Sequence, residues 1–154
     1  MQAANDHLGL DWEIQWEGIN VADAASGLGG DIVVSSGDRT LLVAEVTERL
    51  VDQNRVVATF NNKIGPDQIE DYLFFIRSND QPAEAVEQMR RYFAQGHELN
   101  FVVIQDWADA VLVTIGNPGR TLFLRRIVDL LETADTPAAL KVAWNESVNA
   151  VVNE

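Results

Sequence analysis

The chain has 154 residues, of which 47% are hydrophobic, and 24 acidic against 11 basic side chains give it a net charge of −13. This length and apolar content favour a single packed domain and exclude a disordered chain. The absence of cysteine excludes disulfides, thiol nucleophiles and thiolate zinc sites. No run of about eighteen apolar residues is present, so we expect no membrane helix. No signal peptide is recognisable either, and we therefore expect a cytoplasmic protein.

The first part of the chain, residues 1–28, begins with a polar stretch and continues into a short predicted strand. Trp12, Ile14 and Trp16 alternate with polar residues, and this period of two is typical of a strand. Residues 20–26 are interpreted as a helical turn or a loop, which the glycines at 27–30 end. Two β-rich runs follow, Ile32–Val34 and Leu41–Val43, and the intervening turn residues predict a hairpin.

The remaining sequence alternates between helix and strand patterns. Helices are predicted at about 52–63, 83–95, 121–133 and 136–152, and buried strands at 69–76 and 100–104. Residues 107–115 fit a strand or a helix, with the helix favoured, and 117–119 (Asn-Pro-Gly) predict a break. The alternation predicts an α/β domain with a mixed sheet, in which 29–105 form the core and 106–154 the C-terminal helices.

Two carboxylates stand where apolar strands would not need them. Asp31 opens the first strand of the hairpin, and Glu45 lies late in the second, in the run 41–46 that is otherwise free of charge. A hairpin brings the start of one strand beside the end of the next, so we expect these side chains to meet. Burying Glu45 without a cation or partner would be costly, and paired carboxylates suit Mg²⁺. Asp31 also fits a simple strand-edge aspartate.

This arrangement resembles the core of the PD-(D/E)xK nuclease superfamily, which includes many type II restriction endonucleases. In that pattern an Asp begins one strand and the next strand carries Glu-x-Lys. The corresponding positions here are Asp31, Glu45 and Thr47, so a threonine replaces the final lysine. The stretch from Glu45 to Phe75 is similar to restriction endonucleases of the SacI-like group, and the resemblance covers about residues 29–107.

The resemblance implies a restriction-endonuclease-like domain of three layers and a metal-dependent endodeoxyribonuclease. Mg²⁺, or Mn²⁺ in its place, would be held by Asp31, Glu45 and the main-chain carbonyl of Val46. Either Thr47 or Lys63 would orient the attacking water. Lys63 is one of only two lysines and is a natural substitute for the missing one, although a lysine at a helix C-terminus can also simply complement the helix dipole.

Other polar residues receive weaker assignments. Arg55, on the predicted helix that ends near Lys63, fits a contact to a DNA phosphate or a solvated surface arginine. Glu17 is a possible extra acidic residue of the site. Asp71 is expected to be a cap or turn residue, and the isolated His97 is expected to be structural.

Double-stranded DNA is the implied partner, but the acidity of the chain is unusual for a protein that binds phosphates. It fits either a salt-adapted surface or a catalytic module that depends on a basic partner subunit or domain. Palindromic cutting would require a homodimer. The alternative from a different class is a non-catalytic acidic binding module, in which the lost lysine marks a decayed nuclease site.

Overall fold

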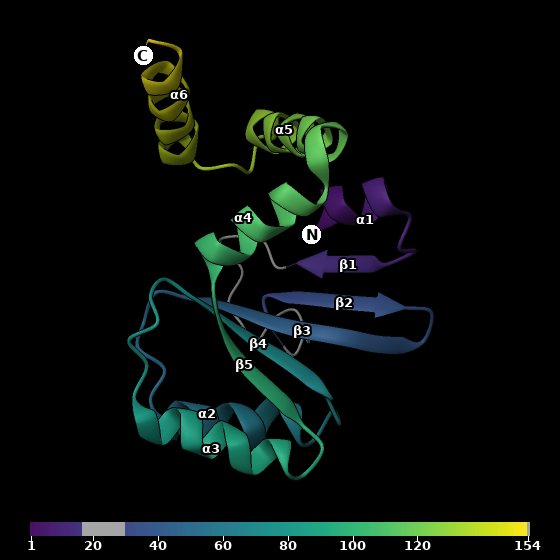
Figure 1. The fold of residues 1–154 in the computed structure, drawn as a ribbon, viewed down its shortest axis with the longest axis vertical. Helices are drawn as coiled ribbons and strands as arrows, with labels where there is room; N and C mark the ends of the chain where they lie inside the picture. The colour runs from purple at the N-terminus through teal and green to yellow at the C-terminus, as the bar shows by residue number, and fades with distance from the viewer. Residues whose placement is uncertain (17–29, 154) are drawn as a thin grey trace.

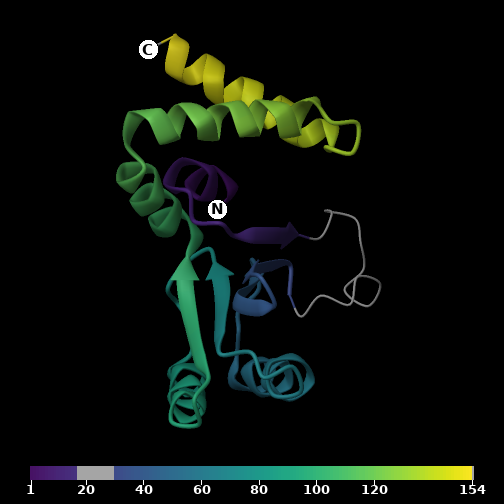
Figure 2. The same cartoon turned by 90° about the vertical axis from the view of Figure 1, so that its right-hand side faces the viewer.

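The computed structural model describes residues 1–16 and 30–153, which form one β-sheet between two layers of helices. No helix among these residues is long and apolar enough to cross a membrane. Helices α2 (Gln53–Thr59) and α3 (Ala83–Phe93) cover one face of the sheet. Helices α1 (Gln2–Leu8), α4 (Ile104–Thr114) and α5 (Gly116–Glu132) lie on the opposite side (Figure 1). The last helix, α6 (Ala138–Val152), follows α5 at the far end of the molecule (Figure 2). The predicted α/β class with a mixed sheet flanked by helices is confirmed.

The sheet has five strands in the order β1-β2-β3-β4-β5. They are β1 (Glu13–Trp16), β2 (Ile32–Ser36), β3 (Arg39–Thr47), β4 (Asp71–Ile76) and β5 (Glu98–Val103). The first three strands are antiparallel neighbours, whereas β4 and β5 run parallel to β3. The predicted hairpin is present as β2 and β3, and Gly37 takes the positive φ of 56° that its tight turn needs.

The core lies between the sheet and the α2–α3 layer. Alternate residues of β4, Tyr72, Phe74 and Ile76, point into it and are almost fully buried. The near-continuous apolar run at 69–76 predicted this buried strand, and the alternation of its side chains between the two faces follows from backbone geometry. On α3, Met89 and Tyr92 are buried against the sheet, whereas Phe93, the residue after Tyr92, is turned away from the core and is 65% exposed.

The helices were predicted well, with two corrections. The polar residues 2–8 form α1, which the sequence pattern did not indicate; its Asn5 side chain pairs with both main-chain groups of Trp12 at 2.8 and 3.0 Å. The expected break at 117–119 is wrong, because Pro118 lies in the first turn of α5, where its missing N–H costs nothing. The chain bends instead at Gly116, which has φ 59°.

Candidate active site at the end of the β2–β3 hairpin

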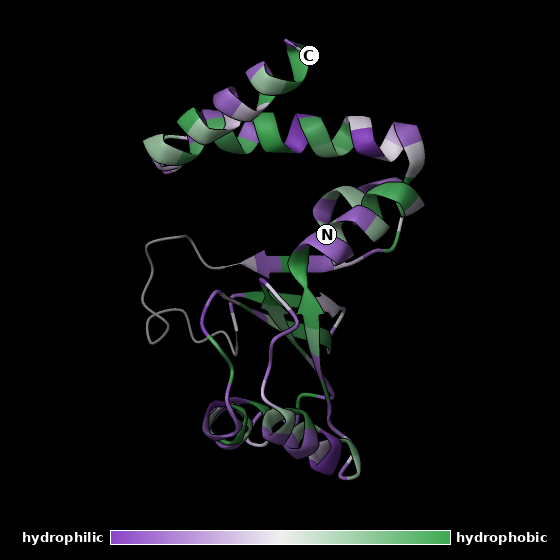
Figure 3. Cartoon of the chain, turned by 60° about the vertical axis from the view of Figure 1, so that its left-hand side comes forward, coloured by the Kyte–Doolittle hydropathy of each residue, from purple (hydrophilic) through white to green (hydrophobic). Residues whose placement is uncertain are grey.

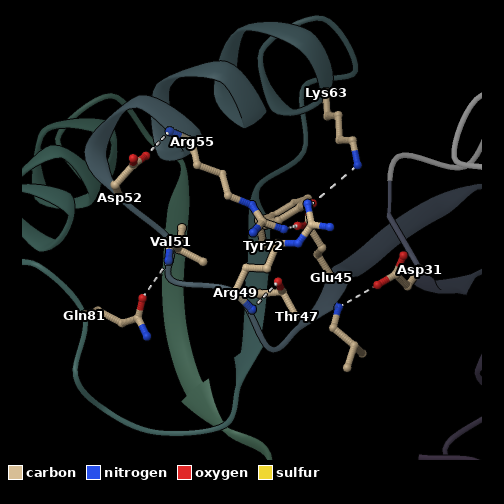
Figure 4. A network of polar contacts seen from close by, with 11 residues as sticks. Asp31, Glu45, Thr47, Arg49, Val51, Asp52, Arg55, Lys63, Tyr72 and Gln81 are labelled. Atoms are coloured by element: carbon tan, nitrogen blue, oxygen red, sulfur yellow. Dashed lines mark hydrogen bonds and ion pairs between the residues drawn. The ribbon is translucent and has the colours of Figure 1, made fainter.

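The β2–β3 register ends with the pair Ile32 and Ala44; Asp31 directly precedes this pair and Glu45 directly follows it. Glu45 points to the face of the sheet that α2 and α3 cover, because Val43, two residues earlier on β3, belongs to the core. Figure 4 shows both carboxylates beside this end of the hairpin.

Asp31 closes the end of the β2–β3 ladder with its side chain. The Val46 N–H donates to Asp31 Oδ2 at 2.6 Å. In an antiparallel pair the N–H and C=O of one residue point to the same neighbouring strand, so the Val46 carbonyl also faces the β2 side. The preceding Gly30 lies tightly against β3, and a Cβ there would come within 2.8 Å of the Ala44 carbonyl oxygen. Asp31 therefore has a fixed place, and its second oxygen has no partner among the described residues.

Glu45 is the centre of a charged network. Its side chain is 12% exposed, and its two oxygens accept from Arg55 and from the hydroxyl of Tyr72, the latter at 3.0 Å. The Lys63 ammonium lies 3.7 Å from Oε2. Two cations thus reach the single carboxylate of Glu45, as the side chains of Arg55 and Lys63 in Figure 4 illustrate. A buried carboxylate needs such partners to offset its desolvation.

Local structure in the segment after β3 supplies both cations. Asp52 caps α2 by accepting from the Arg55 N–H at 2.8 Å, which starts the helix with Arg55 in its first turn. The helix then widens into a π-helical turn, η1 (Phe60–Ile64), which carries Lys63. Single π turns of this kind occur frequently at functional sites. The predicted helix at 52–63 is confirmed, but its π-helical end had no signal in the sequence.

Tyr72 is a member of the network that the sequence did not reveal. It is fully buried on β4, and burial together with the negative charge of Glu45 raises its pKa far above the ordinary value. The hydroxyl therefore stays protonated and remains a donor to Glu45. In the sequence, Tyr72 lies within an apolar run of strand residues, where an aromatic residue indicates only core packing.

The other sequence-based candidates are placed as follows. The Thr47 hydroxyl is buried at the end of β3 and accepts from the Arg49 N–H at 3.2 Å. Arg55 pairs with Glu45, so it is not the solvated surface arginine that was the alternative to a phosphate contact. Glu17 lies outside the described residues.

Asp71 and His97 lie at the opposite end of the parallel strands. Asp71 begins β4 and is not a cap or turn residue, and its Oδ1 is buried without a hydrogen-bond partner among the described residues. Burial and the neighbouring Glu98 charge raise its pKa. The His97 ring lies 2.7 Å from the Ile69 carbonyl oxygen and packs edge-on against Phe60, which is a structural role as expected.

Among residues 1–16 and 30–153, no three His, Cys, Asp or Glu side chains gather where they could hold a metal. The hairpin end offers two carboxylates and one main-chain carbonyl as oxygen donors, and Mg²⁺ is often bound by one or two carboxylates with phosphate and water completing its shell. One oxygen of Asp31 has no partner among the described residues, whereas both oxygens of Glu45 have partners.

Comparison with known proteins does not assign the chain to a family. No protein-family model matches it, and no curated protein matches it. The function is therefore inferred from the residues and their geometry.

Proposed function

We propose that this chain is a metal-dependent endodeoxyribonuclease of the restriction type, with a restriction-endonuclease-like fold. The observation that carries the proposal is that Asp31 accepts from the Val46 N–H, next to Glu45 at the end of the β2–β3 hairpin, while Lys63 reaches the Glu45 carboxylate. The mixed sheet between two helical layers is compatible with that fold. The resemblance of the sequence around these residues to PD-(D/E)xK nucleases supports the same assignment.

In this proposal Asp31, Glu45 and the Val46 carbonyl hold Mg²⁺ or Mn²⁺ together with a DNA phosphate. The bound metal supplies an activated water nucleophile and stabilises the leaving oxygen. Asp31 is suited to this role because the Val46 N–H fixes one of its oxygens at 2.6 Å, and no other residue within 1–16 and 30–153 binds its second oxygen. The same contact fixes the position of the Val46 carbonyl, so these oxygen ligands are already in place before the metal binds.

Lys63 takes the place of the lysine that the sequence lacks at position 47. Its ammonium approaches Glu45 from η1 at 3.7 Å, a loose contact of a side chain that is 30% exposed. A long, flexible ammonium can turn from the carboxylate to a phosphate or a water molecule when substrate arrives. Thr47 is less suited, since its hydroxyl is turned toward the main chain of Arg49.

Arg55 has a different role, which is to neutralise Glu45 beside the bound phosphate. Its guanidinium pairs with Glu45 and is 30% exposed, so it is accessible from solvent. With a net charge of −13, the chain needs such local cations, and a basic partner or a second subunit, to approach DNA.

One observation favours the alternative of a non-catalytic acidic binding module. Both oxygens of Glu45 already have partners, Arg55 and Tyr72, and a carboxylate in a closed network can serve stability alone. The two functions differ in whether a divalent cation replaces part of this network.

Cleavage of supercoiled plasmid DNA with Mg²⁺ or Mn²⁺, at low and high salt, tests the proposal. We expect discrete fragments from the wild-type chain and at least a hundredfold loss of rate, roughly the cost of removing one key transition-state contact, in Asp31→Asn and Glu45→Gln. Glu70→Gln, which removes an exposed carboxylate paired with Arg39, is the matched control and should cleave normally. Nicking confined to branched DNA would indicate a structure-specific nuclease instead. No cleavage by folded protein would contradict the proposal and favour the binding module.

A further inference from the structure

Strand β5 forms one edge of the sheet, and within the described part of the chain only β4 pairs with it. The Glu98 N–H donates to the carbonyl of Glu70, just before β4, at 2.7 Å. Glu98 and every second residue after it therefore turn their main-chain groups toward β4. The N–H and C=O groups of the residues between them, Leu99, Phe101 and Val103, point outward from the edge. Figure 2 shows β5 and α3 at one side of the molecule, with no other described strand or helix alongside the outer edge of β5.

This edge lacks the protection that sheet edges in natural proteins usually have. Lysine, proline, a bulge or a covering element normally blocks an open edge, because its free main-chain groups would otherwise pair with another chain. β5 has the sequence Glu-Leu-Asn-Phe-Val-Val, without lysine or proline, and its register with β4 runs without a shift. It is also mainly apolar, as are the strands above α2 and α3 in Figure 3. An open edge of this kind is suited to accept an added strand.

A cavity lies between this edge and α3. Its volume is about 400 Å³, which is within the usual range for ligand sites. Leu99 and Phe101 of β5 line it together with Val86 and Phe93 of α3. Val86 and Phe93 share one flank of α3, because residues seven apart in a helix lie on the same side. Phe93 is 65% exposed, so it offers its apolar surface to a ligand rather than to the core.

Arg90 adds a positive charge to the same wall of the cavity. It lies one turn before Phe93 and lines the cavity. Its ion pair with Glu87 is loose, at 3.6 Å, and the Arg90 side chain is 75% exposed. Exposed pairs of this kind are weak, so the guanidinium is available to a carboxylate of a ligand. The Glu98 carboxylate also lines the cavity, but the Asn100 amide holds one of its oxygens at 2.9 Å.

We propose that β5 and α3 bind an extended peptide of another protein, which adds a strand to the sheet at β5. The peptide main chain pairs with the outward N–H and C=O groups of Leu99, Phe101 and Val103. Every second peptide side chain points to the α3 face and enters the cavity, so the peptide carries apolar residues at alternate positions. An acidic residue at another of these positions pairs with Arg90. The site is two strands away from β3, which carries Glu45, so it does not depend on the proposed nuclease activity.

A second copy of the chain fits this edge less well than a peptide does. Helix α3 lies beneath β5 itself, while α2 covers the strands further in (Figure 2). Neighbouring strands are about 4.8 Å apart, whereas the axes of packed helices are about 8–10 Å apart. Two copies joined through antiparallel β5 strands would therefore bring their α3 helices too close together. A peptide in extended form brings no helix with it.

Selection of peptides from a random phage-displayed library on the immobilised chain tests the proposal. We expect enriched sequences with apolar residues at alternate positions and an acidic residue beside them. Binding of one enriched peptide, synthesised with a fluorescent label, is then measured by anisotropy. Val103→Pro should weaken it about fivefold by removing one outward N–H, and the φ of −66° at Val103 already suits proline. Arg90→Glu should weaken it about tenfold, because like charges then meet, and changing the acidic residue of the peptide to lysine should restore binding.

Phe93→Ser should also weaken the peptide about tenfold, since it removes the aromatic wall of the cavity. The matched control is Val113→Ser on α4, which changes a residue that is 76% exposed and should leave binding unchanged. Arg90 and Phe93 are both exposed, so their variants should keep the circular dichroism of the wild type.

Two results would overturn the proposal. One is the absence of enriched sequences, or an enriched peptide whose affinity is the same in Val103→Pro, Arg90→Glu and the wild type. The other is a molar mass by light scattering of twice the chain mass of 17.1 kDa that falls to a single chain in Val103→Pro, because a second copy would then occupy the edge.

Discussion

Replacing Glu45 by glutamine perturbs the network at its centre while keeping its shape. The carboxylate is 12% exposed and has three partners, Arg55, Tyr72 and Lys63. A hydrogen bond to a charged group contributes roughly 1.5–3 kcal/mol, and breaking a buried ion pair costs about 3–5 kcal/mol. Water can partly replace the lost anion at Arg55 and Lys63, which are each 30% exposed. We therefore expect the free energy of unfolding to fall by about 2–3 kcal/mol, or a melting point roughly 4–10 °C lower for a domain of this size.

Urea unfolding followed by tryptophan fluorescence in EDTA measures this loss. Glu70→Gln is the control, because its ion pair with Arg39 is largely exposed, and such pairs contribute at most about 1 kcal/mol. Combining Glu45→Gln with Arg55→Gln should cost less than the sum of the two single changes, since one interaction is removed twice. A Glu45→Gln protein as stable as the wild type, or more stable, would refute the reasoning, because desolvation of the carboxylate would then outweigh its contacts.

Three further predictions concern Arg55 in the network around Glu45, Asp71 at the opposite end of the sheet, and Gly30 beside the hairpin. Arg55→Gln should tighten Mn²⁺ binding roughly twentyfold in titration calorimetry relative to Arg39→Gln, because removing a unit charge about 5 Å from a divalent ion is worth roughly 1.7 kcal/mol even at the dielectric constant of water. Equal affinities would contradict the placement of the metal at Glu45. The pKa of Asp71 is raised in the folded state, so the stability of the fold falls as the pH rises above 3.8, the value for an unfolded aspartate. Asp71→Asn should therefore raise the urea midpoint at neutral pH and leave it unchanged below pH 3.8. An effect of the variant that does not depend on pH would contradict this reasoning. Gly30→Ala should lower the unfolding free energy by about 1–3 kcal/mol in the same urea assay, since the new Cβ would lie 2.7 Å from a Val43 methyl; a neutral result would show that the chain there moves freely.

The sequence predicted those features that depend on local pattern or hairpin geometry. A near-continuous apolar run located β4, and the turn residues located the β2–β3 hairpin. That hairpin brings Asp31 to the Val46 N–H beside Glu45, because an antiparallel pair brings the start of one strand next to the end of the other. The single charge in the run 41–46 also indicated correctly that Glu45 would need partners.

Features that depend on tertiary contacts could not be predicted in this way. Tyr72 joins the network because β4 lies parallel to β3, and no local pattern specifies that pairing. The helix α1 forms from a polar stretch because Asn5 holds the following main chain. On α5 the periodicity indicates an amphipathic helix, yet Leu124 is 51% exposed, because a periodic pattern shows which residues share a face and not what packs against that face.

The proposal that Asp31 and Glu45 together hold a divalent cation is tested most directly by titrating the folded chain with Mn²⁺ in a calorimeter. We expect one binding site per chain, lost in both Asp31→Asn and Glu45→Gln and retained in Glu70→Gln. Binding that is absent from the wild type, or unchanged in the two variants, would contradict it.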